Sequence, residues 1–152
     1  MLPISQLDQF LEDNSDIEMF EILLHDLNGT QRGKWLPKDK IHKVFNGGFK
    51  MPLSSCSFDC WGRDQEELIK ATGDADGICV PHAETLAMVP WAEKATAQMI
   101  ISMGNESGDG PYGGDCRSVL KSVVDRFGQL GLTPVVASEM EFHLLTLERD
   151  KF

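Results

Sequence analysis

The sequence lacks several features of membrane, secreted and nucleic-acid-binding proteins. No apolar run approaches the ~20 residues that a membrane-spanning helix needs, and Met1 to Phe10 contains neither a basic segment nor a signal-type apolar core. Basic residues are scarce, since 14 Lys and Arg against 24 Asp and Glu give a formal net charge of −10. Because an acidic surface repels phosphate backbones and anionic lipid, we expect a soluble, cytoplasmic protein that binds neither nucleic acid nor membranes.

The 4 cysteines are too few and too irregularly spaced to indicate a disulfide framework in a chain of 152 residues. Cys56-x3-Cys60 followed by Cys79-x2-His82 loosely has the spacing of a zinc site. However, Cys79 ends a short apolar run that is typical of a strand. We therefore expect free, buried thiols at these positions, with structural zinc as the less favoured alternative.

What is present is enough apolar residue, 41% of the chain, for a packed core. The hydrophobic pattern predicts one small mixed sheet with little helix before residue 104. An Asn28-Gly29 pair predicts a hairpin, because both residues tolerate positive φ. The expected strands or extended segments cover residues 17–27, 30–36, 51–61, 78–80, 86–89 and 96–103, and the expected helices cover 5–14, 39–45 and 65–71.

A composition shift divides the chain at Gly104 to Gly114, where five glycines and Pro111 indicate a linker. Asp115 can then cap a helix over residues 116–130, with an apolar face and Gly131 as its stop. A strand over residues 133–147 follows. Because one helix and one strand cannot close a core, this second part is expected to be the beginning of a larger domain.

The expected last strand places Glu139, Glu141 and His143 on one face, because residues two apart in a strand point the same way. A half-solvated strand with a polar outer face explains this pattern. The alternative is a site for a hard cation, in which each carboxylate holds Mg²⁺ or Mn²⁺ and leaves positions for phosphate oxygens. Spacing alone leaves both interpretations open.

The hairpin carries a second charged group. Asp26 lies at the end of the outgoing strand, and Arg32 and Lys34 lie on the returning strand. A charged hairpin tip is the ordinary interpretation. The functional alternative places Asp26 against a cation and the basic residues against anions.

Several ordered motifs resemble the N-terminal third of the glutamine synthetase family, and most closely its γ-glutamyl-polyamine synthetase branch. The run D-L-N-G-T-Q-R-G-K from Asp26 to Lys34 is similar to the family hairpin. The runs G-D-A-D-G at 73–77, T-L at 85–86 and V-P-W at 89–91 follow in the family order. P-Y-G-G-D-C-R at 111–117 resembles the entry to the catalytic domain, and S-E-M-E-F at 138–142 resembles the family's metal-binding strand.

The resemblance implies an α+β fold. Residues 1–103 would form a β-grasp (ubiquitin-like) domain, 104–115 a linker, and 116–152 the truncated start of the catalytic domain. The full-length family members are ligases that use ATP to phosphorylate glutamate and then pass the γ-glutamyl group to ammonia or a primary amine. The implied cofactors are Mg²⁺ or Mn²⁺, and stacked rings imply a homo-oligomer.

The resemblance also implies roles for three residues. Glu139 and Glu141 would each give one carboxylate to a metal site, where the cations neutralise charge on phosphate. Asp26 would be presented to a neighbouring subunit's active site, near the amine. The Arg32-Gly33-Lys34 version of the hairpin favours a polyamine or other primary amine over ammonia as the acceptor. Cys116 departs from the family pattern, which has proline before Arg117.

Two interpretations of the whole chain remain. In the first, the 152 residues are the N-terminal part of a ligase and are inactive alone, with weak Mg²⁺ binding and an apolar surface that promotes self-association. In the second, they are a non-catalytic β-grasp interaction module, since fold does not fix function. A coding region that continues past Phe152 with further Glu, His and Arg sites favours the ligase.

Overall fold

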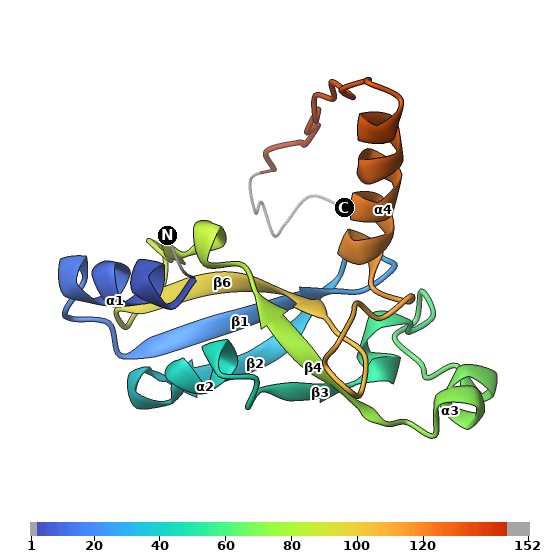
Figure 1. Ribbon diagram of the computed structural model, residues 1–152. Coiled ribbons are helices and arrows are strands. Elements are labelled where there is room, and N and C mark those ends of the chain that lie inside the picture. The colour runs from blue at the N-terminus through green and yellow to red at the C-terminus, as the bar shows by residue number, and fades with distance from the viewer. Residues whose placement is uncertain (1–2, 146–152) are drawn as a thin grey trace, which may run out of the picture.

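A mixed sheet surrounded by short helices forms the body of the protein, and the computed structural model describes residues 3–145 (Figure 1). This mixed composition agrees with the expected class. The strands are β1 (Met19–His25), β2 (Gln31–Pro37), β3 (Lys50–Pro52), β4 (Asp76–Pro81), β5 (Ala87–Met88) and β6 (Thr96–Met103). The α-helices are α1 (Pro3–Asp13), α2 (His42–Phe45), α3 (Glu66–Thr72) and α4 (Cys116–Gln129), and the 3₁₀ turns are η1 (Lys38–Lys40), η2 (Leu53–Cys56) and η3 (Ala83–Thr85).

The strand order is β2-β1-β6-β4-β3, with β5 paired to β6. β1 and β2 form an antiparallel hairpin in which His25 lies opposite Gln31, so the hairpin predicted from Asn28-Gly29 is confirmed. β6 joins β1 in parallel, which places the first and last strands side by side in the middle of the sheet (Figure 1). β4 and β3 complete the sheet through antiparallel pairs.

Alternation along β1 gives the sheet a buried face and an open face. Phe20, Ile22 and Leu24 are fully buried, whereas the residues between them are partly exposed. This period of two is what a strand with one face on the core requires. Leu7 of α1 and Val44 of α2 belong to the same core cluster. The opposite face of β1 is therefore left for other contacts.

Before residue 104, two expected elements differ in the structure. The first helix begins at Pro3 rather than at Ser5. The segment 51–61 is extended only at residues 51–52, because β3 ends at Pro52 and the chain turns at once into η2. Proline has no N–H to continue a ladder, and the backbone after it makes a tight turn instead of a strand.

The glycine-rich segment 104–115, expected to be a linker, folds back on the sheet. Gly104 forms an isolated bridge with Pro111, and the Tyr112 N–H donates to the Met103 carbonyl over 2.9 Å. Gly104 lies so close to the β4 backbone that a Cβ would not fit there. The segment thus fixes where α4 begins.

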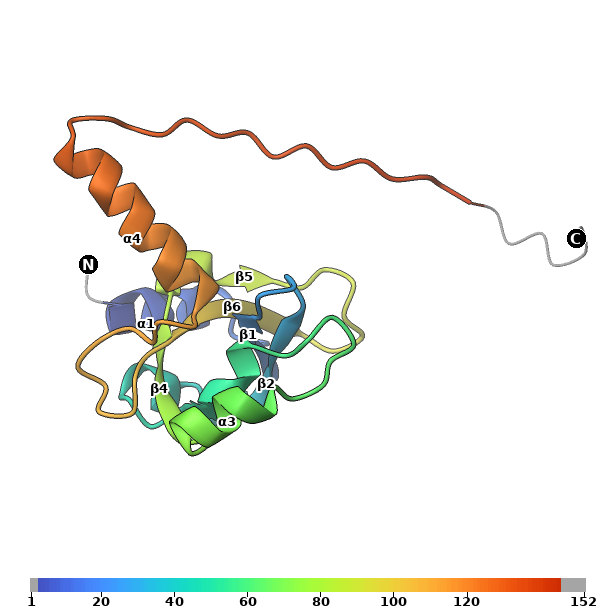
Figure 2. The same ribbon diagram turned by 90° about the vertical axis from the view of Figure 1, so that its right-hand side faces the viewer.

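Helix α4 stands away from the sheet, and the chain after it runs along no other element (Figures 1 and 2). The predicted helix and its Asp115 cap are confirmed. The predicted strand 133–147 is wrong over residues 133–145, which contain no helix or strand, while 146–147 lie outside the described residues. At 14 residues α4 is the longest helix within 3–145, and none in that range is long and apolar enough to cross a membrane.

Candidate functional site

The buried carboxylate of Asp26 holds the turn between β1 and β2. Its Oδ1 accepts hydrogen bonds from the N–H groups of Asn28 and Thr30, both at 2.9 Å. Its Oδ2 accepts from Nε of Arg32 at 3.0 Å. Asp26 is only 1% exposed, and Gly29 completes the turn with φ +74°. Both carboxylate oxygens therefore have donors from the hairpin itself.

The ionised form of Asp26 is the stable form in this setting. Burial raises the pKa of Asp26, but hydrogen bonds from the Thr30 N–H, the Arg32 side chain and the Asn28 N–H outweigh burial and bring the pKa below its ordinary value of 3.8. Donors aimed at a carboxylate favour its charged form. At neutral pH the hairpin thus contains a fixed negative charge that orients Arg32.

Arg32 connects the hairpin to the loop after η2. Its guanidinium carbon lies 4.6 Å from the centre of the Phe58 ring, a cation–π arrangement. Asn28 ties the same loop down, because its Nδ2 donates to the carbonyls of Phe58 at 2.8 Å and Asp59 at 3.2 Å. The Arg32 side chain is 31% exposed, and within residues 3–145 only its Nε is paired. Its outer N–H groups are available to an anion.

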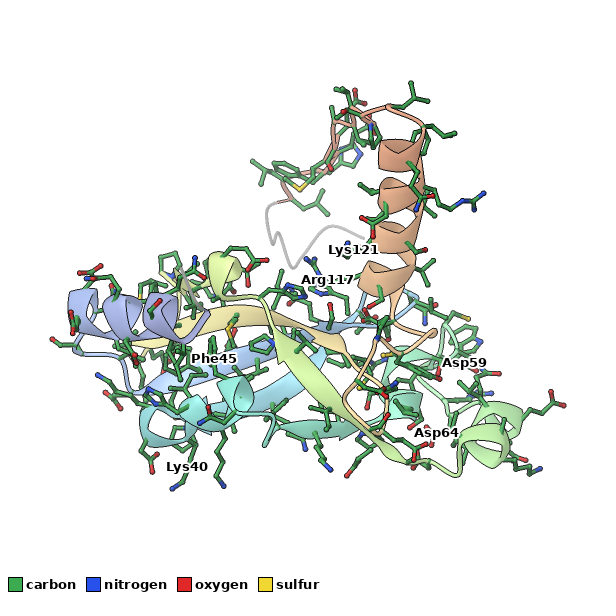
Figure 3. All side chains as sticks on the ribbon, viewed as in Figure 1. Lys40, Phe45, Asp59, Asp64, Arg117 and Lys121 are labelled. Carbon is green, nitrogen blue, oxygen red and sulfur yellow. The ribbon has the colours of Figure 1, made fainter. Side chains whose placement is uncertain are left out.

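The loop beside Arg32 is itself ordered by a carboxylate. Oδ1 of Asp59 accepts from the N–H groups of Trp61 and Arg63, both at 2.8 Å. Asp59 and Asp64 lie in this loop between η2 and α3 (Figure 3). The loop is therefore a defined wall next to the hairpin tip.

Gly33 lets β2 approach β1 between the two basic residues. Its φ is +151°, and a Cβ there would collide with the carbonyl oxygen of Ile22. No other residue type fits without moving the backbone. The ammonium of Lys34 next to it lies 5.7 Å from the centre of the Phe49 ring. The Arg32-Gly33-Lys34 run thus has a definite backbone shape.

The start of α4 meets the end of β1, next to Asp26. Oδ2 of Asp115 accepts from the N–H of Ser118 at 2.8 Å, which caps the helix, and Sγ of Cys116 donates to the His25 carbonyl at 3.4 Å. Oδ1 of the fully buried Asp115 and Nε of Arg117 are buried without a hydrogen-bond partner in the described part of the chain. Arg117 lies at the base of α4 (Figure 3).

The structure does not bring Glu139 and Glu141 to this junction. Both are exposed in the segment after α4 that forms no strand, and so is His143. A strand needs a neighbour to pair its backbone groups, and the described residues supply none here. The expected common face of the three polar residues is therefore not formed in this chain.

The possible zinc ligands also differ in how exposed their side chains are. Cys56 and Cys79 are each 1% exposed, whereas Cys60 is exposed, and all are free. Burial is the main cause that raises the pKa of both core thiols to about 12. Within residues 3–145, no group of three or more His, Cys, Asp and Glu side chains is arranged to hold a metal ion.

One polar cluster was missed by sequence reasoning, because Ser102 lies 20 residues from His82 in the chain. Nε2 of His82 lies 2.7 Å from Oγ of Ser102, and Nδ1 lies 3.2 Å from Oε1 of Glu84. This order of atoms is that of a Ser-His-acid triad. However, Ser102 is 9% exposed in the middle of β6, where it pairs with Val80. A nucleophile needs open approach, so we assign the cluster to holding the turn after β4.

Comparison with known proteins gives sequence relatives over most of the chain. Gamma-glutamylputrescine synthetase PuuA of Escherichia coli is 34% identical over 147 residues, covering 95% of this chain and 31% of the relative. Glutamate–methylamine ligase of Methyloversatilis universalis is 28% identical, covering 93% of this chain and 29% of the relative. Glutamine synthetase of Pyrococcus abyssi is 26% identical, covering 82% of this chain and 25% of the relative. No protein-family model matches the chain.

Solved structures agree with these relatives. The GmaS/ADP complex matches with a TM-score of 0.62 and 25% identity, covering 86% of this chain and 26% of that one. Apo GmaS matches with the same TM-score and identity over 82% of this chain. The chain thus spans between a quarter and a third of the length of the proteins that it matches. It is a homologue of the N-terminal portion of the glutamine synthetase family ligases.

Proposed function

We propose that the chain is the N-terminal part of an ATP-dependent ligase that joins glutamate to a primary amine or ammonia through γ-glutamyl phosphate. The observation that carries this proposal is the homology to gamma-glutamylputrescine synthetase over 95% of the chain. Another relative is also a glutamate–amine ligase by name, glutamate–methylamine ligase. A primary amine is therefore our first choice of acceptor.

The domain division proposed for this ligase follows the sequence motifs. Residues 1–103 form a β-grasp domain, 104–115 a connection, and 116–152 the start of the catalytic domain. The β1–β2 hairpin and the parallel placement of β6 beside β1 support the β-grasp assignment. The upright α4, with an apolar face exposed along its length, supports a second domain that begins there.

Asp26 has a positioning part in this proposal. The family resemblance places it at a neighbouring subunit's active site in a homo-oligomer, near the amine, and that role stays a prediction. Since donors from the hairpin occupy both oxygens, Asp26 acts through Arg32, whose side chain is 31% exposed. A fixed guanidinium is suited to bind the anionic groups of glutamate or phosphate.

Glu139 and Glu141 are the proposed metal ligands. They carry hard oxygen donors, which suit Mg²⁺ or Mn²⁺, and neither has an ion-pair or hydrogen-bond partner within the described residues. They would hold the cation, which supplies charge neutralisation at the phosphates of ATP. Two carboxylates alone bind Mg²⁺ weakly because Mg²⁺ keeps its waters. We therefore propose that the 152-residue chain is inactive alone.

The test is ATP consumption by the polypeptide that the gene encodes, with whatever follows Phe152, compared with the 152-residue chain. Phosphate release that requires both glutamate and an amine supports a ligase, and putrescine, methylamine and ammonium are compared as acceptors. Greater efficiency with ammonium would reverse the choice of acceptor. No glutamate-dependent ATP consumption with any acceptor would favour the non-catalytic β-grasp module instead.

A further inference from the structure

A cavity of about 350 Å³ lies on the open face of the sheet, away from the Asp26 turn. One wall comes from the hairpin, where Glu21 of β1 lies opposite Trp35 of β2. The other wall is the connection from β5 to β6, which contributes Trp91 and Glu93. This connection is anchored by the Val89 N–H, which donates to the Thr96 carbonyl at 2.8 Å. The volume suits a small molecule.

Two indoles line this cavity and are mostly exposed. Trp35 is 74% exposed and Trp91 is 78% exposed, although indoles are normally well buried. The cavity surface between them is mainly apolar, with Met19 and Val89 among its lining. The face of an indole attracts a cation more strongly than any other side-chain ring does. Two indoles on one cavity therefore favour an organic cation with an aliphatic part.

The charges at the cavity are negative and mostly unpaired. Neither Glu21 nor Glu93 has an ion-pair or hydrogen-bond partner in the described part of the chain. Lys94 also lines the cavity, and its ammonium lies 3.8 Å from the carboxylate of Glu18, so the two lining carboxylates outnumber the one lining ammonium. Carboxylates beside a low-dielectric wall concentrate cations and repel anions. The chain's net charge of −10 acts in the same direction.

We propose that this cavity binds a small aliphatic primary amine in its protonated form. The ammonium group lies against the carboxylates of Glu21 and Glu93 and an indole face of Trp35 or Trp91, and the carbon chain lies on the apolar lining that Met19 and Val89 contribute. Metal cations are disfavoured because the cavity offers few oxygen ligands for its size. The inference stands apart from the proposed ligase, because binding here needs neither ATP nor glutamate.

The experiment is a fluorescence titration of the 152-residue chain with n-butylamine at neutral pH and constant ionic strength. The titration uses a Trp61→Phe variant, because Trp61 is 77% exposed, lines no part of this cavity and would add unrelated emission. We expect a saturable change in emission, and at least about fivefold weaker binding of the neutral analogue n-butanol. Isothermal titration calorimetry reports the same binding if the emission is insensitive.

Charge variants test the assignment to this cavity. The double variant Glu21→Gln, Glu93→Gln should weaken n-butylamine binding by about fourfold or more, from the usual size of exposed charge pairs. Glu12→Gln with Glu67→Gln makes the same change in net charge outside the cavity and should leave binding unchanged.

Three results would overturn the proposal: no saturable binding by either method, equal binding of n-butanol, or equal weakening by both double variants. Sedimentation at the titration concentrations gives the last check. If Glu21→Gln, Glu93→Gln changed the association state and not amine affinity, the occupant would be a second copy of the chain. Ligase activity enters none of these readouts.

Discussion

At the scale of single residues, Asp26 determines the shape of the hairpin tip. Three donors converge on its buried carboxylate, at 2.9, 2.9 and 3.0 Å. The same carboxylate fixes Arg32, which in turn stacks on Phe58 and so reaches the loop after η2. One side chain thus links a turn, a strand and a neighbouring loop.

Replacing Asp26 with alanine should lower the free energy of unfolding by about 2 kcal/mol, because buried donors lose their acceptor. Urea unfolding measures the change. Asp39→Ala is the control, since Asp39 is exposed and forms an ion pair with its neighbour Lys40. Equal effects of the two variants would mean that the hairpin does not depend on the Asp26 carboxylate.

The stability supplied by Asp26 should depend on pH in the acid range. Its folded pKa lies below the ordinary value of 3.8, so the contribution is complete above the unfolded pKa of ~3.9 and is lost as pH falls through the folded pKa. The free energy of unfolding, measured from pH 6 down to pH 2, should therefore decrease less steeply for Asp26→Asn than for the unchanged chain. Parallel curves for the two proteins would rule this out.

Sequence reasoning identified Asp26 and Arg32 by their places around Asn28-Gly29, but it did not pair them with each other. Their contact depends on the register of the hairpin, with His25 opposite Gln31, and on burial of the turn by η2. A pattern of residue types carries neither fact. For the same reason His82 and Ser102 could not be linked before the pairing of β4 with β6 was known.

At the scale of elements, sequence signals correctly predicted the elements that are stabilised by interactions between residues close in the chain. The hairpin follows from a turn dipeptide, and α4 follows from a cap and an apolar periodicity. The prediction of a strand at 133–147 is wrong over its described part, because a strand forms only when a neighbouring strand pairs with its backbone. Glu139 and Glu141 were assigned a common face on that basis, so their arrangement could not be obtained from this chain.

Gly33 offers a test of the hairpin as an element. Gly33→Ala should lower the free energy of unfolding by at least about 2 kcal/mol, because the added Cβ meets the Ile22 carbonyl oxygen in a strained backbone region. Gly128→Ala is the control, because Gly128 lies in α4 with nothing near its Cβ position, and it should raise stability by about 0.5–1 kcal/mol. Thermal unfolding of both variants measures these changes, and a stable Gly33→Ala protein would contradict the close approach.

At the scale of the whole molecule, the sheet packs on a buried core, whereas the apolar face of α4 is exposed. Leu120 is 64% exposed and Phe127 is 39% exposed on α4, and Val135 and Val136 after it are 95% and 88% exposed. Soluble monomers rarely leave so much contiguous apolar surface in water. This surface is consistent with the proposal that a further domain begins at residue 116.

The isolated chain should therefore self-associate through α4. Sedimentation velocity over a range of concentrations should show association that Leu120→Lys weakens, because a charge in an apolar contact is costly. Leu27→Lys is matched to it, since Leu27 is 63% exposed on another surface, and should leave association unchanged. A concentration-independent monomer would show that the apolar face of α4 has no such partner.

The most direct measurement of the central claim is ligase turnover by the polypeptide that the gene encodes, with both Glu139 and Glu141 changed to Gln. If these carboxylates hold the divalent cation, turnover should fall at least about 100-fold, the usual cost of losing charge stabilisation at a reacting group. The pair Glu12→Gln, Glu67→Gln should retain full turnover. Undiminished turnover and metal dependence in the Glu139→Gln, Glu141→Gln enzyme would contradict the account.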